Sequence, residues 1–235
     1  MNTGRTDGIV LVSVLLLTLL MSALGAALVL LTSSEAAIAA NFRDGQEARY
    51  AAEVAANRAL LDLAAAGDWD RVLDGTMAPA FADGPPHGSR TLPDGSTIDL
   101  DAVEHLANCR KVFACTSTEM DAVTTERPWG PNNPRWRLWA YGWLRDAFQP
   151  PSANARVVER AGSDARYYVM VLIADDPSET DGDPSRDGRP PNPGAGVVIL
   201  RARAFGAHGV RRAVELAVGR AASGNLRLLS WREMM

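Results

Sequence analysis

The feature that most constrains this chain is a stretch of 27 residues, 8–34, that carries no charged side chain. Its apolar run, residues 9–31, would form a helix about 34 Å long, enough to cross a hydrocarbon core of about 30 Å. No second stretch of the chain is long and apolar enough to span a bilayer. The sequence therefore excludes both a water-soluble globule with one uniform core and a polytopic membrane protein.

Charge and motif content exclude two further classes. The formal net charge of −4 gives the chain no overall basic field, so we do not expect nucleic acid as a partner. The sequence has no hydrolase nucleophile motif, no phosphate-binding loop and no zinc-protease motif. No acidic residue is marked by its neighbours as a general acid or base. The sequence therefore predicts a protein that is not an enzyme.

Three interpretations of the apolar run compete. A cleaved secretory signal has a formal site at residues 37–39 (Ala-Ile-Ala), but the 23-residue run is longer than the usual signal core of about 7–15 residues. An uncleaved single-pass anchor is the second. The third is a type IV pilin-like segment, which we favour because a short hydrophilic leader, residues 1–8, ends in Gly8 and the apolar block begins at once with Ile9.

The helical pattern continues beyond the apolar run. Residues 32–66 contain no proline and a single glycine, and they are rich in Ala, Glu, Arg and Leu, which favour helix. Apolar side chains recur there at helical spacing, at Ile38, Phe42, Tyr50, Val54 and Leu61. We therefore expect one helix from Ile9 to about Ala66, with a membrane-spanning half (9–31) and an amphipathic half (32–66).

Residues 39–60, AANFRDGQEARYAAEVAANRAL, resemble the region that follows the membrane helix in PilX-type minor pilins and pilus assembly proteins. The stretches 133–138 (NPRWRL) and 228–233 (LLSWRE) are also similar to that group. The clear resemblance covers residues 5–66, about a quarter of the chain. It implies cleavage after Gly8 by a prepilin peptidase and N-methylation of Ile9.

The same resemblance implies a location and partners. The chain would sit in inner-membrane lipid as a single-pass protein with its C-terminal domain in the periplasm. It would then enter a type IV pilus or related filament beside other pilin-like subunits. The amphipathic half of the helix would supply subunit contacts through Phe42, Tyr50 and Val54.

One residue departs from the pilin pattern. Most major pilins carry glutamate at the fifth position of the mature chain, where Ser13 stands here. In filament models that carboxylate neutralises the N-terminal amine of the neighbouring subunit, and a buried charge needs a partner. We therefore expect a minor, initiating or tip-located subunit, with Ser13 at a subunit contact. The alternatives are a type II secretion tip pseudopilin and a signal-anchored periplasmic binding domain outside any filament.

Residues 67–235 are predicted to form an extracytoplasmic antiparallel sheet domain, so the chain as a whole is α+β and pilin-like. A short helix is expected at 101–108, capped by Asp101. Turn-rich loops are expected at 68–95 and 175–196. Strands are predicted at 135–144, 156–160, 166–174, 197–205, 210–219 and 226–231. Apolar and charged residues alternate along 197–205 and in part along 135–144, and 197–205 with 210–219 is the clearest hairpin.

Two features of this domain bear on chemistry. Cys109 and Cys115 are expected to form a disulfide in an oxidising periplasm, the alternative being two free thiols. Residues 175–187 hold six acidic side chains, which could bind Ca²⁺ through Asp181, Asp183 and Asp187. Because the spacing is not that of an EF-hand and two prolines interrupt it, we favour a solvated loop and predict no cofactor.

Four tryptophans lie within 15 residues, at Trp129, Trp136, Trp139 and Trp143. We expect most of them in the sheet core, the alternative being an exposed binding strip. Trp136 and Trp139 should face opposite sides of a regular strand, so the sequence predicts that both are core only if a bulge intervenes.

Overall fold

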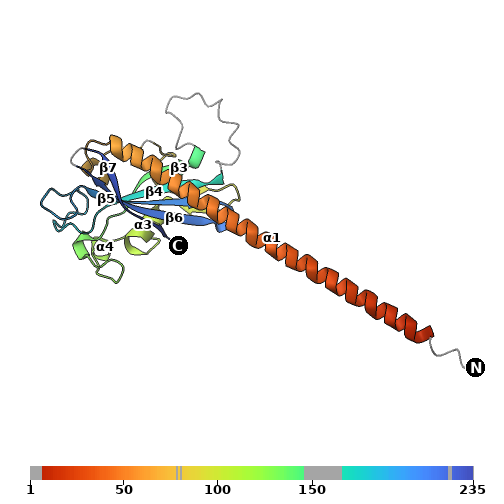
Figure 1. The fold of residues 1–235 in the computed structure, drawn as a ribbon. Coiled ribbons are helices and arrows are strands. Elements are labelled where there is room, and N and C mark those ends of the chain that lie inside the picture. Colours follow the sequence, from red (N-terminus) through yellow and green to blue (C-terminus); the bar gives the residue numbers. More distant parts are fainter. Residues whose placement is uncertain (1–6, 78, 80, 146–165, 222–223, 235) are drawn as a thin grey trace, which may run out of the picture. The chain divides into compact units, whose positions relative to one another are not determined.

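The computed structural model describes residues 7–77, 79, 81–145, 166–221 and 224–234 (Figure 1). The chain divides into two compact units, Met1–Asp44 and Gly45–Met235. The helix α1 (Asp7–Ala65) supplies the described structure of the first unit and the opening element of the second. Its bounds agree with the single long helix expected from the sequence. The strand expected at 156–160 lies outside the described residues.

The second unit is built on an antiparallel sheet whose described strands lie in chain order, β3-β4-β5-β6-β7. The expected hairpin is present, with Phe205 opposite Arg211 across a tight turn in which His208 adopts a left-handed φ of 57°. The α+β layout predicted from the sequence is therefore confirmed. The strands are β3 (Arg137–Trp143), β4 (Tyr168–Asp175), β5 (Val197–Phe205), β6 (Arg211–Arg220) and β7 (Leu226–Met234).

Smaller elements join α1 to this sheet and connect its strands. They are α2 (Asp70–Leu73), the paired strands β1 (Ser89–Thr91) and β2 (Thr97–Asp99), α3 (Leu100–Cys109), α4 (Ser117–Met120) and the 3₁₀ turns η1 (Gly130–Asn132) and η5 (Ala207–Gly209). The predicted cap of α3 is wrong by two residues: Asp99 caps the helix, accepting from the Ala102 N–H at 2.9 Å. Asp101 instead accepts from the Gly88 N–H at 2.9 Å, so it ties the helix to the preceding loop.

Both faces of the sheet are covered at the strand β4. Along β4 the odd-numbered side chains, such as Val171, pack in one cluster with α1, and the even-numbered ones, such as Leu172, pack in another with α3 and β2. Every residue of β4 is consequently buried. Figure 1 shows the last turns of α1 lying across the strands.

The face of α1 that contacts the sheet is made of alanines. Small side chains let the helix axis approach the strands closely, and the contact ends in Leu63. The compact unit therefore begins at Gly45 and includes the end of α1, whereas the sequence suggested a sheet domain starting at residue 67. The buried alanines are Ala48, Ala51, Ala52, Ala55, Ala56 and Ala59.

The tryptophans follow from this two-sided burial. Trp136 belongs to the cluster on the α3 face and Trp139 to the cluster on the α1 face, and both are buried. The sequence predicts two core tryptophans here only with a bulge, and a register shift does occur, between Leu138 and Ala140. The two rings are buried on opposite sides of the sheet because both faces of this strand meet protein. Trp143 packs edge-on against Tyr168, with ring centroids 5.4 Å apart, and Trp129 is 43% exposed.

The alanine contact yields a prediction. Replacing Ala52 by leucine inserts methylene groups into a closely packed helix–sheet contact, so it should lower the free energy of unfolding by about 1–3 kcal/mol. The same change at the exposed Ala64, on the same helix, should alter it by no more than about 0.5 kcal/mol. Chemical unfolding of the detergent-solubilised full chain, followed by circular dichroism, measures both. Equal effects at the two positions would contradict the packing described here.

Candidate functional site

The first unit consists, in its described part, of a helix with exposed apolar side chains. The large hydrophobic side chains from Ile9 to Leu31 are all more than half exposed. This is the one helix among the described residues that is long and apolar enough to cross a membrane. Exposed apolar surface on all sides of a helix is favourable only against lipid or other apolar helices.

Three hydroxyl groups in and next to this segment are compatible with such surroundings. Ser13 donates its hydroxyl to the Ile9 carbonyl at 2.9 Å, Thr18 to the Leu15 carbonyl at 2.9 Å and Thr32 to the Leu28 carbonyl at 2.8 Å. These three side chains are therefore satisfied by their own helix and need no water. The Ser13 position carries no charge that could pair with a neighbouring amine.

Gly8 lies in the first turn of α1, directly before the apolar block. A Cβ atom at this position would meet nothing within 4 Å. Neither packing nor, in a helix, backbone conformation requires glycine here. The fold therefore gives no reason of its own for a glycine at this point.

The three residues expected to contact other subunits differ in exposure. Phe42, in the first unit, is 69% exposed, and Tyr50, in the second, is 59% exposed. Val54 is half-buried. Because the alanine face of α1 makes the contact with the sheet, the bulky aromatic side chains of the same helix stay available to a partner.

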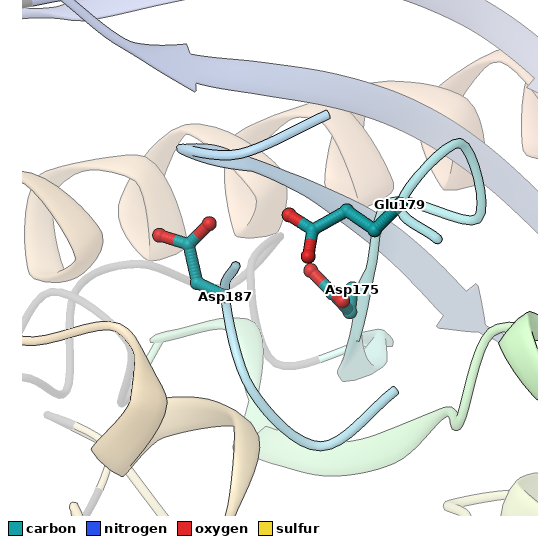
Figure 2. A group of neighbouring side chains, drawn as sticks. All are labelled: Asp175, Glu179 and Asp187. Atoms are coloured by element: carbon teal, nitrogen blue, oxygen red, sulfur yellow. The ribbon is translucent and has the colours of Figure 1, made fainter. Parts of the chain in front are cut away.

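A cluster of carboxylates forms where β4 ends. Asp175 is the last residue of the strand, Glu179 follows in the next turn and Asp187 lies further along the same loop. One oxygen from each lies within 4.8 Å of the others. Figure 2 shows the carboxylates of Asp175 and Glu179 next to each other, with Asp187 facing them from the opposite side of the loop.

Two oxygens of this acidic cluster have no hydrogen-bond donor. Asp175 and Glu179 are each 2% exposed, and Asp175 Oδ1 and Glu179 Oε1 are buried without a partner. Backbone N–H groups satisfy other oxygens: Gly188 donates to Glu179 Oε2 at 2.8 Å, and Gly196 donates to Asp187 Oδ1 at 2.5 Å. Among the residues that the structure describes, no ion pair engages these three side chains.

The sequence-predicted cation ligands are only partly brought together. Asp187 joins the cluster, whereas Asp181 and Asp183 do not, since their carboxylates cap local turns by accepting from the N–H groups of Asp183 and Ser185. Sequence reasoning missed Asp175 and Glu179 among the six acids. The position of Asp175 could have identified it, because a strand buried on both faces places its last side chain inside the protein.

Burial controls the ionisation of the cluster. It raises the pKa of Asp175 to about 9, and the charge of Glu179 adds to the effect. It likewise raises the pKa of Glu179 to about 7, against the opposing hydrogen bond from Gly188. The pKa of Asp187 is also raised by burial, with the Gly196 hydrogen bond and the charge of Arg220 opposing the rise.

Two further features lie on the α3 side of the domain. A disulfide joins Cys109 and Cys115, with the Cα atoms 6.0 Å apart.

On the sheet, Glu215 lies between two arginines: Arg201 donates to it at 2.7 Å and Arg232 at 2.8 Å. Arg201 also stacks on the Trp136 ring, 4.0 Å from its centroid. Sequence reasoning missed this group of charged side chains and Trp136. They line a hollow together with Leu106 and Trp129.

The raised pKa values predict an unusual pH dependence of stability. A carboxyl whose pKa is higher in the folded than in the unfolded chain favours folding when protonated, so stability falls as pH rises from about 4 towards the folded pKa values. With a chelator present, the free energy of unfolding should decrease between pH 5 and pH 9. The acids Asp68, Asp70, Asp176 and Asp181 add to the repulsion, and Arg220 reduces it.

Asp175→Asn should flatten this decrease, because the amide stays neutral, whereas Asp183→Asn should leave it intact. Urea unfolding of the detergent-solubilised chain at pH 5, 7 and 9 measures the slope. An identical slope in the protein and in Asp175→Asn would show that burial of this carboxyl does not govern the dependence.

Comparison with known proteins gives one match. Residues 7–57 match the family model described as PilX N-terminal. No curated protein and no solved structure matches the chain. The match covers the apolar helix and its continuation to the first alanine contacts with the sheet. The N-terminal segment of the chain, with its exposed apolar helix, is therefore similar to the PilX N-terminal domain of type IV pilus proteins, and the strands of the sheet lie outside the match.

Proposed function

We propose that the chain is a minor pilin-like subunit that initiates or caps a type IV pilus or related filament. The observation that carries the proposal is the fully exposed apolar helix at residues 9–31, within the PilX N-terminal match. Such a helix needs an apolar environment at two stages: lipid before assembly and the helices of other subunits after it. The role is structural, as is that of the PilX family.

Processing by a prepilin peptidase fits the beginning of α1. The bond between Gly8 and Ile9 separates polar from apolar residues, and the fold does not itself require glycine there. A protease that accepts only a small residue before the cut explains the glycine. Cleavage would leave the apolar segment on the mature protein, with a methylated amine at Ile9.

The residue Ser13 supports a position for this subunit at one end of the filament. Its hydroxyl is bonded to the Ile9 carbonyl, so the side chain offers no anion to the amine of an adjacent subunit. An amine buried between helices without a counter-charge is unfavourable. A subunit of this kind suits a position that is filled once, rather than one repeated along the fibre.

The proposed location in the cell follows from the same pilin-like assignment. Residues 9–31 anchor the chain in the inner membrane in a single pass, and the sheet domain lies in the periplasm. The Cys109–Cys115 disulfide agrees with an oxidising compartment. The type II secretion tip pseudopilin and the anchored periplasmic domain outside any filament are the other outcomes of the tests below.

The first test is the N-terminus of the membrane-extracted protein, determined by intact mass and terminal peptide mapping. We expect a start at methylated Ile9, lost in cells without the prepilin peptidase. Gly8→Leu should block cleavage completely while leaving the thermal unfolding of the sheet domain unchanged, because a side chain there has free space. A start at Met1 or near Ala40 in normal cells would overturn the pilin assignment.

The second test concerns subunit contacts. Phe42→Ala and Tyr50→Ala should lower the amount of the chain in sheared filaments several-fold without changing its thermal stability, since both rings are exposed. Val123→Ala, at another exposed apolar position away from α1, is the control and should leave filament incorporation unchanged. Recovery in a secretion pseudopilus instead of a pilus would assign the chain to that system.

A further inference from the structure

We propose that Asp175, Glu179 and Asp187 bind a divalent cation, and that Ca²⁺ is the ion they fit. The proposal is independent of the filament role. It rests on two observations: three carboxylates converge within 4.8 Å, and two of their oxygens are buried with no donor. Like charges in this arrangement need a positive partner at their centre.

The basic group whose charge acts on Asp187, Arg220, does not supply that partner. Arg220 donates to the carbonyls of Ala66 at 2.7 Å and Gly67 at 2.9 Å, and its guanidinium stacks 4.3 Å from the centroid of the Trp69 ring. Its charge reaches Asp187 without an ion pair in the described structure. The buried oxygens of Asp175 and Glu179 therefore face one another without a basic side chain between them.

The loop holds the three side chains in place for a ligand. The Gly188 and Gly196 N–H groups each fix one oxygen of Glu179 and Asp187. The Asp187 N–H donates to Asp70 Oδ1 at 2.9 Å, which ties the loop to α2. At Gly194, with φ at +84°, a Cβ would lie 2.9 Å from Glu179 Cγ, so the backbone closes around the glutamate.

The coordination preferences of the two ions favour Ca²⁺ over Mg²⁺. The ligand oxygens here lie within 4.8 Å of one another, and oxygens that share one Ca²⁺, at about 2.3–2.6 Å each, can be separated by up to about 5 Å. Mg²⁺ binds at about 2.1 Å and demands a near-ideal octahedron. Ca²⁺ also accepts irregular coordination, and the half-buried Asp187 leaves room for water to complete it.

The experiment uses the full chain in detergent micelles, stripped with a chelator, and CaCl₂ as the probe. Calorimetric titration should give one site with a Kd at or below about 1 mM, and CaCl₂ should raise the melting temperature. MgCl₂ at the same concentration should do so by less than half as much. Asp175→Asn and Glu179→Gln should abolish both the heat of binding and the rise in melting temperature.

Two controls make the result decisive. Asp181→Asn and Asp183→Asn change acids of the same loop whose carboxylates cap local turns, and they should retain the full Ca²⁺ response. The metal-free Asp175→Asn protein should melt no lower than the metal-free parent, because it has lost a buried carboxyl that is costly to ionise. Should that variant fail to fold, Asp187→Asn, at the half-buried position, replaces it in the same titration.

Absence of Ca²⁺ binding by the parent chain at several times this concentration would overturn the proposal. So would an unchanged Ca²⁺ response in Asp175→Asn and Glu179→Gln, or a response lost in Asp183→Asn alone. None of these results bears on cleavage after Gly8, so failure here and failure of the filament assignment are distinguishable.

Discussion

The structure depends on how one helix divides its surface. Over residues 45–65, α1 gives its smallest side chains to the sheet, and this close contact covers one whole face of the central strands. Because alanine fills the contact, the larger side chains of the helix, such as Tyr50, remain outside. A helix that instead buried its largest side chains in its own domain would have fewer to offer a neighbour. Folding and assembly therefore use different faces of the same element.

Much of this fold can be read from the sequence. Strand β5 is evident because apolar and charged residues alternate along it, and α1 because no proline interrupts it. The face that α1 buries is not evident, since bulky apolar residues mark one stripe and alanines another. Only the shape of the opposing sheet selects the alanines. The strongest hydrophobic stripe of a helix is thus an unsafe guide to its core face when the helix also has external partners.

The acidic loop shows a second limit. Spacing along the chain pointed to Asp181 and Asp183, which satisfy turns in their own neighbourhood. Asp175 and Glu179 converge because a buried strand ends beside a loop that folds back, and no local pattern encodes that return. The same holds for Glu215, whose two arginine partners come from the strands on either side. Long-range pairings of polar groups are set by register, which local sequence specifies weakly.

Burial of every residue of β4 has a consequence for biosynthesis. A run of eight residues with high strand propensity and only a terminal charge is the kind of segment that associates with other chains while it is uncovered. Its covers, α1 on one side and α3 with β2 on the other, both precede it in the chain. Since synthesis proceeds from the N-terminus, both covers have left the ribosome before β4 emerges. The order of elements thereby shortens the interval in which this strand is open to aggregation.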